Sequence, residues 1–75
     1  MSELTQYLVC DVELKVSGPH QKTVTAWTAS ALRRIADRLE RHEFDDGHHD
    51  VTDNAGRSIG SVYFDFSEGY ESDEP

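Results

Sequence analysis

Histidines and carboxylates gather in one short stretch, residues 42–50, which reads HEFDDGHHD. These side chains bind divalent metals when several of them converge on one point. The spacing does not supply that convergence, because the adjacent His48 and His49 would point to opposite faces of a strand. His42 and Glu43 also lack the rest of the HExxH zinc motif, since an aspartate occupies the place of its second histidine. We expect a polar, solvated loop with no metal, and an adventitious divalent site is the alternative.

The sequence contains little that supports nucleophilic or acid–base catalysis. The one cysteine, Cys10, lies on the apolar side of an alternating segment, where a thiol is expected to be buried and to act as a small hydrophobe. The carboxylates of Asp45 and Asp46 could exchange protons, but nothing in the sequence desolvates them. The chain has no glycine-rich phosphate loop or nucleophile elbow, and 75 residues are too few to enclose a deep pocket. We expect no enzyme and no cofactor.

The charge of the chain is strongly uneven. Seven Lys and Arg against 15 Asp and Glu give a net charge of −8. Residues 1–29 carry −1, residues 30–42 carry +2, and residues 43–75 carry −9, with ten acids against one arginine. An acidic field repels nucleic acids and membrane surfaces and steers the protein towards basic partners. The alternative is that the acidity only keeps the chain soluble in a salt-rich cytoplasm.

Length and hydropathy indicate one small cytoplasmic domain. No run approaches the roughly 20 apolar residues of a membrane span, and no basic-then-apolar signal peptide begins the chain. A single cysteine excludes an internal disulfide framework. Domains of this size bury only about 60% of their unfolded surface, so disulfides, metals or oligomerisation often support them.

Period-two alternation predicts a first strand from Tyr7 to Val16, because apolar and polar side chains alternate along it. Residues 17–20 carry turn chemistry. Residues 21–28 are rich in Thr and Val, so they are predicted as the second strand of an antiparallel hairpin.

A helix is predicted next, with Thr28 or Ser30 as its N-cap and its end at residues 42–44. Its apolar stripe follows helical spacing and consists of Leu32, Ile35, Ala36 and Leu39. Residues 48–52 form a weak strand candidate, residues 53–56 a turn, and residues 58–66 the last strand, in which Gly60 marks a bulge.

These elements predict an α+β domain over residues 1–66, in the order β-β-α-β-β. One amphipathic helix packs on one face of an antiparallel sheet of about four strands. The sheet face expected under the helix consists of Leu8, Cys10, Val12, Leu14, Val16, Val62, Phe64 and Phe66. Residues 67–75 are predicted to be a disordered acidic tail, since they hold four acids and no aliphatic residue.

The opposite face of the predicted sheet carries apolar and aromatic side chains, which are enriched at contact surfaces. Its members are Tyr7, Val9, Trp27, Ile59 and Tyr63. Clustered, they would form the surface of a homodimer or of a partner; singly exposed, they carry no such meaning. Trp27 has a second possible place, folded over the sheet edge into the core.

Two charged groups are further candidates for binding. The helix carries Arg33, Arg34, Arg38 and Arg41, which could contact phosphates or could simply form an exposed helix face. The acids expected to bind a basic partner are Glu43, Asp45, Asp46, Asp50, Asp53 and Asp65. Carboxylates on a rigid surface can occupy a nucleic-acid channel, because its Lys and Arg do not distinguish carboxylate from phosphate by charge.

In general character the chain resembles the small acidic inhibitors encoded by phages and other mobile elements, among them anti-CRISPR proteins and DNA mimics. The resemblance rests on size, acidity, the predicted element order and the absence of catalytic motifs. It covers the whole chain without a specific motif, so no residue role is carried over. It implies binding to a nucleic-acid-handling protein and blockage of its nucleic-acid site.

The leading hypothesis is therefore a non-enzymatic acidic binding module. It would inhibit or regulate a nucleic-acid-binding protein or complex by occupying its basic surface, without binding nucleic acid or membrane itself. The alternative is a small structural or assembly protein that associates with itself and whose acidity is only solvation.

Overall fold

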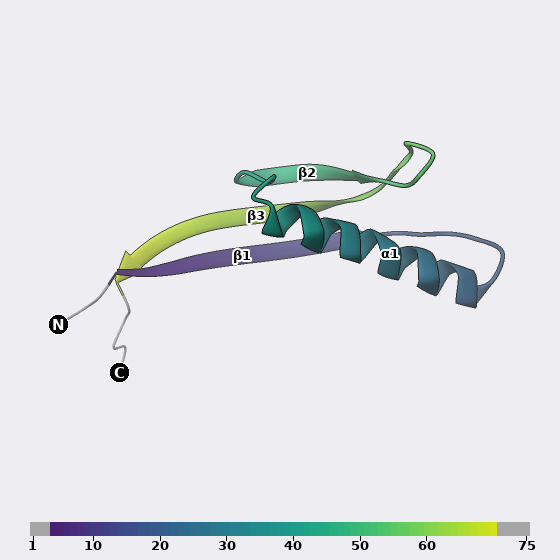
Figure 1. Cartoon of the computed structure of the whole chain (residues 1–75), viewed down its shortest axis with the longest axis horizontal. Coiled ribbons are helices and arrows are strands. Elements are labelled where there is room, and N and C mark those ends of the chain that lie inside the picture. Colours follow the sequence, from purple (N-terminus) through teal and green to yellow (C-terminus); the bar gives the residue numbers. More distant parts are fainter. Residues whose placement is uncertain (1–3, 71–75) are drawn as a thin grey trace.

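The computed structural model describes residues 4–70, which form one helix and one three-stranded sheet (Figure 1). The elements are β1 (Leu4–Leu14), α1 (Gln21–Glu40), β2 (Gly47–Thr52) and β3 (Ser58–Tyr70). All strand pairs are antiparallel, and β3 lies between β1 and β2. The predicted α+β class with one helix and an antiparallel sheet is confirmed, but the order is β-α-β-β, and the described chain has three strands instead of about four.

The missing strand is the start of α1. Residues 21–28, predicted as a strand, are helical. Their Thr and Val content favours strands locally, but Val24, Thr28, Ala31 and Ile35 are spaced four, three and four residues apart, which places them on one helix face. The Thr28 hydroxyl donates a hydrogen bond to the Val24 carbonyl at 2.8 Å, so its polar group is satisfied inside the helix. The N-cap position is His20, not Thr28 or Ser30.

The buried stripe of α1 is rotated from the predicted one. Ala31 and Ile35 are buried and Leu39 is half-buried, whereas Leu32 is 44% exposed and Ala36 is exposed. The helix ends at Glu40, two residues before the predicted end, and His42 follows with a positive φ of 59°. The helix therefore begins at Gln21 and includes residues 21–28, which the strand prediction had excluded.

The core lies where α1 meets β2 and β3. Val62 and Phe64 on β3 are completely buried, and they pack with Ile35, Phe44 and Val51. Phe44 follows the helix in a stretch that was predicted as a polar loop, yet its ring lies 4.7 Å from the Phe64 ring between centroids. This small cluster holds the helix on the sheet.

The predicted turn and the predicted bulge between β2 and β3 are close to where the structure has them. Residues 53–56 form the expected turn, in which the Gly56 N–H donates to the Asp53 carbonyl at 3.0 Å. Gly60 lies beside the register shift between Val51 and Thr52. A Cβ atom at Gly60 would collide with the Glu13 carbonyl oxygen, so the close approach of β1 requires glycine there.

Most of the predicted helix-facing side of β1 is exposed, although Leu14 at its end is half-buried and packs against the core. The register pairs Leu8 with Phe66, Cys10 with Phe64 and Val12 with Val62, so these side chains do share one face. Nevertheless Leu8, Val12 and Phe66 are 45%, 42% and 43% exposed. Cys10 is also exposed, which corrects the expectation of a buried cysteine. The reason is that the core lies over β2 and β3, and nothing in residues 4–70 covers this part of β1.

Strands β1 and β3 extend past the rest of the fold. Strand β2 stops pairing at Phe64, whereas β1 pairs with β3 as far as Tyr70 (Figure 1). We call residues 4–9 and 65–70 the arm. Residues 67–70, predicted as part of a disordered tail, belong to this strand pair, and residues 71–75 lie outside the described residues. The radius of gyration is 16.3 Å, against about 11 Å for a compact domain of this length.

The helix α1 is not long and apolar enough to cross a membrane, and the described chain has no other helix.

Candidate acidic binding face

The side of the sheet away from α1 collects alternate residues of all three strands, and we call it the open face. Because Val62 and Phe64 point to the helix, their neighbours Ser61, Tyr63 and Asp65 point the other way. The register extends this face sideways in rows. One row is Asp11, Tyr63 and His48; the next is Glu13, Ser61 and Asp50; a third joins Val9 to Asp65.

The open face is acidic and has no balancing base on its strands. It carries the carboxylates of Asp11, Glu13, Asp50 and Asp65, and the three strands contain no lysine or arginine. Asp11 and Glu13 are separated by two residues, or about 7 Å along the strand, and neighbouring strands are about 4.8 Å apart. The four carboxylates of the open face are thus held at fixed spacings, because the strands that carry them are hydrogen-bonded to one another.

An aromatic pair lies in the middle of this array. The rings of His48 and Tyr63 are 4.8 Å apart between centroids and tilted by 44°. Carboxylates accept hydrogen bonds from guanidinium and ammonium groups, and a tyrosine ring can stack on a guanidinium. Asp50 is held in place by the Ser58 hydroxyl, which donates to its Oδ1 at 2.7 Å. The chemistry of this face suits arginine and lysine side chains of another molecule.

The six acids predicted to bind a partner do not form one patch. Asp50 and Asp65 lie on the open face. Glu43 instead forms ion pairs with Arg38 at 3.2 Å and Arg41 at 3.1 Å. Its charge is therefore used within the chain, where it joins the loop to the end of α1.

Asp53 also has an internal role. Its carboxylate accepts the backbone N–H groups of Ala55 at 2.9 Å and Arg57 at 3.0 Å, and it pairs with the Arg57 side chain at 3.4 Å. The hydrogen bond from the Arg57 N–H is the main cause that lowers the pKa of Asp53 below its ordinary value. Asp53 thus closes the turn between β2 and β3.

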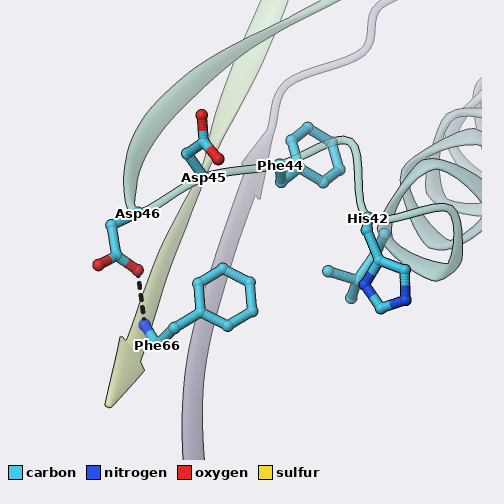
Figure 2. A pocket seen from close by; sticks show the side chains of 6 residues that line it. His42, Phe44, Asp45, Asp46 and Phe66 are labelled. Atoms are coloured by element: carbon cyan, nitrogen blue, oxygen red, sulfur yellow. Dashed lines mark hydrogen bonds between the residues drawn. The ribbon is translucent and has the colours of Figure 1, made fainter.

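Asp45 and Asp46 lie beside an open depression of about 610 Å³ at the end of α1 (Figure 2). Asp46 accepts the N–H of Phe66 at 2.8 Å, just past the point where β2 stops pairing with β3. Asp45 is exposed, and its backbone carbonyl lies 2.6 Å from the His49 Nε2. Asp46 therefore ends the β2–β3 ladder by replacing a backbone acceptor.

Asp11 and Glu13 are the open-face acids that the sequence prediction did not select. Alternation had already placed both on the polar side of the first strand. Their meeting with Tyr63 and Asp50 depends on β3 lying between the other two strands, and that order is not encoded in any local pattern.

The predicted contact face is only partly assembled. Tyr7, Val9 and Tyr63 share the open face through the β1–β3 register. Trp27 lies on α1 instead, 51% exposed, and its ring is so close to Gly18 that a Cβ there would meet it at 2.9 Å. The wrong strand prediction for residues 21–28 is the cause of its misplacement.

Three of the four arginines predicted on the helix have partners within the chain, although Arg41 itself follows the last residue of α1. Arg34 donates to the Asn54 side chain at 2.9 Å and to the Thr52 carbonyl at 3.3 Å. Arg38 lies over the Phe44 ring at 4.5 Å from its centroid, besides pairing with Glu43. Arg41 pairs with Asp37 and Glu43. These contacts tie α1 to the following loop and to the β2 end.

The histidine-rich stretch is divided between the loop and β2. His48 lies on the open face, whereas His49 packs its ring 5.0 Å from Phe44 on the core side. Among residues 4–70, no group of three His, Cys, Asp or Glu residues is placed to hold a metal ion.

Comparison of the chain with protein-family models, with curated proteins and with solved structures finds no match in any of the three.

Proposed function

We propose that this chain is a non-enzymatic acidic binding module that inhibits or regulates a nucleic-acid-binding protein by occupying its basic surface with the open face. The observation that supports this most is the array of Asp11, Glu13, Asp50 and Asp65 on three strands that contain no lysine or arginine. A nucleic-acid site presents arginine and lysine donors to phosphate oxygens, and carboxylate oxygens satisfy the same donors.

The charge distribution supports the same direction of binding. The net charge of −8 steers the chain towards basic partners and away from nucleic acids. Arg34, Arg38 and Arg41 make hydrogen bonds or ion pairs inside the chain, which compete with contacts to a phosphate backbone. The three strands that form the open face, in contrast, contain no lysine or arginine.

The test compares two variants with the same change in net charge. One neutralises the open face by Asp11→Asn, Glu13→Gln and Asp65→Asn. The matched control neutralises exposed acids elsewhere, by Glu40→Gln, Asp45→Asn and Glu68→Gln. Affinity capture from a lysate with the wild type identifies a nucleic-acid-binding protein, and that purified protein is then tested for nucleic-acid binding in the presence of each variant.

We expect the wild type and the control to inhibit nucleic-acid binding, and the open-face variant to lose this effect. Equal inhibition by both variants would show that net charge alone acts, and it would refute a role for the open face. Failure of the wild type to inhibit the captured protein would refute the proposed function.

A second candidate is a small structural or assembly protein that associates with itself. The observation favouring it is the exposure of Leu4, Leu8, Val12 and Phe66 along β1 and β3. In that case we expect the chain to associate with itself in solution and to inhibit no nucleic-acid-binding protein.

A further inference from the structure

Over residues 4–10, strand β1 is a sheet edge without the usual protection against pairing. Natural edge strands are guarded by charged side chains (lysine above all), by proline, by bulges or by shortness. The 11 residues of β1 include no proline, lysine or arginine, and their register with β3 is continuous from Leu4 to Leu14. The other edge, β2, has six residues and a register shift, and Arg34 donates to the Thr52 carbonyl. Only β1 offers an extended open ladder in residues 4–70.

Two hydrogen bonds identify which backbone groups of β1 point outward, away from β3. The Phe66 N–H donates to Asp46, on the β2 side, so the opposed pair Leu8 and Phe66 is not hydrogen-bonded. The Lys15 N–H donates to the Ile59 carbonyl, which fits the same alternation. The N–H and C=O groups that point away from β3 are therefore those of Leu4, Gln6, Leu8, Cys10 and Val12.

The side chains along this edge are apolar on both sheet faces. Leu4, Leu8 and Val12 are 53%, 45% and 42% exposed on the helix side. Tyr7 and Val9 are 45% and 49% exposed on the open face. Residues 4–10 carry no charged side chain, although the chain as a whole carries −8. This strip is thus where two copies can approach with the least repulsion.

We propose that β1 pairs antiparallel with β1 of a second copy, with Leu8 of one copy opposite Leu8 of the other. The two copies are related by a two-fold axis that is perpendicular to the sheet and passes midway between the two Leu8 residues. This register places Leu4 opposite Val12 of the second copy and Tyr7 opposite Val9. Gln6 then lies opposite Cys10. Apolar side chains that are exposed in one copy are paired with apolar side chains of the other.

Charge disfavours the registers that are centred closer to the acidic end of β1. An axis through Val12 would oppose Asp11 to Glu13, and like charges directly opposite are destabilising. An axis through Val9 would place Tyr7 opposite Asp11, and one through Cys10 would place Val9 opposite Asp11. With Leu8 on the axis, Asp11 faces the polar Thr5.

The pairing explains why so small a core is sufficient. The buried apolar residues of the described chain are Ala31, Ile35, Phe44, Val51, Val62 and Phe64. A domain of this size is marginal on its own, and oligomerisation is one of the common remedies. The two-fold axis yields a continuous six-stranded sheet with both helices on one side and both open faces on the other. The pairing does not depend on the proposed inhibitory function.

Proline at an outward position tests the pairing without disturbing β3. Gln6→Pro removes an N–H that points to the open edge, a place where strands tolerate proline. The matched control, Gln6→Ala, removes the side chain and keeps the N–H. Sedimentation velocity over a concentration series measures association, and circular dichroism monitors the fold.

We expect wild type and Gln6→Ala to dimerise, and Gln6→Pro to weaken the dimer by at least about tenfold, because each copy loses a hydrogen bond and meets the proline ring. A wild type that stays monomeric at every concentration overturns the proposal. So does a folded Gln6→Pro variant that dimerises like the control.

Disulfide crosslinking tests the register. In Gln6→Cys, each new cysteine lies opposite the native Cys10 of the second copy, within the Cα separation that a disulfide requires. We expect mild oxidation to give a covalent dimer with Gln6→Cys, and not with wild type or with the double variant Gln6→Cys, Cys10→Ser. Equal crosslinking of wild type or of the double variant overturns the register.

Discussion

Phe66 continues the apolar alternation of Val62 and Phe64 along β3, but its environment is the opposite of theirs. Val62 and Phe64 are completely buried, whereas Phe66, two residues further on, is 43% exposed. The difference arises because β2, α1 and Phe44 cover the first half, and only β1 accompanies the second half into the arm. Alternation therefore specifies which face a side chain takes, while burial depends on whether another element reaches that far.

The largest effect is expected from breaking the packed half. Phe64→Ala removes a completely buried ring that contacts Phe44, and such truncations cost about 3–5 kcal/mol. Leu8→Ala changes an exposed side chain of the arm, so we expect about 0.5 kcal/mol or less for the isolated monomer. Urea unfolding at a protein concentration below the dimerisation range measures both free energies of unfolding.

One outcome would contradict this comparison, and another would extend it. Similar losses from both variants in the monomer would mean that the arm is packed as firmly as the core. A loss from Leu8→Ala that appears only at high protein concentration would instead support burial of Leu8 by a second copy.

The contrast also explains which parts of the fold could be predicted. The alternation around Leu8 and Phe66, the turn at residues 53–56 and the glycine at position 60 are local signals, and the structure has them where the sequence placed them. The strand order is not local. The acids Asp11 and Asp50 reach the same face only because β3 lies between their strands.

The errors come from local preferences that tertiary contacts override. Thr and Val at residues 21–28 favour a strand, but they continue a helix that is held on the sheet further along, by the buried Ala31 and Ile35. Phe44 was hidden in a polar stretch, and its burial depends on the Phe64 ring from another strand. Among the predicted acids, the sequence alone does not distinguish a free carboxylate from one that binds an arginine, as in Glu43, or a backbone N–H, as in Asp46 and Asp53.

A smaller effect is expected where the packed half gives way to the arm. Asp46→Ala removes the acceptor for the Phe66 N–H, a hydrogen bond of 2.8 Å at the end of the β2–β3 ladder (Figure 2). We expect a loss of about 1 kcal/mol in the free energy of unfolding, because water replaces the carboxylate at this exposed position. Amide hydrogen exchange of Phe66 should accelerate more than that of Val62, and equal acceleration would mean that the two halves are not separable at this point.

The smallest effect is expected at the turn that closes the packed half. The carboxylate of Asp53 accepts two backbone N–H groups, and the one from Arg57 lowers the pKa of Asp53 most. Because the pKa is lower in the folded state, the ionised group stabilises the fold above the unfolded pKa, and this contribution is lost as the pH falls through the folded value.

We therefore expect Asp53→Asn to be slightly less stable than wild type at about pH 7, where the native carboxylate is ionised in both states. The difference should shrink on acidification, because protonation removes the same charge from the wild type. Urea unfolding of both proteins at neutral pH and at the lowest pH where they fold measures this change. A difference that stays constant with pH would show that Asp53 acts through the shape of its side chain, and the charge would then have no part in holding the turn against β3.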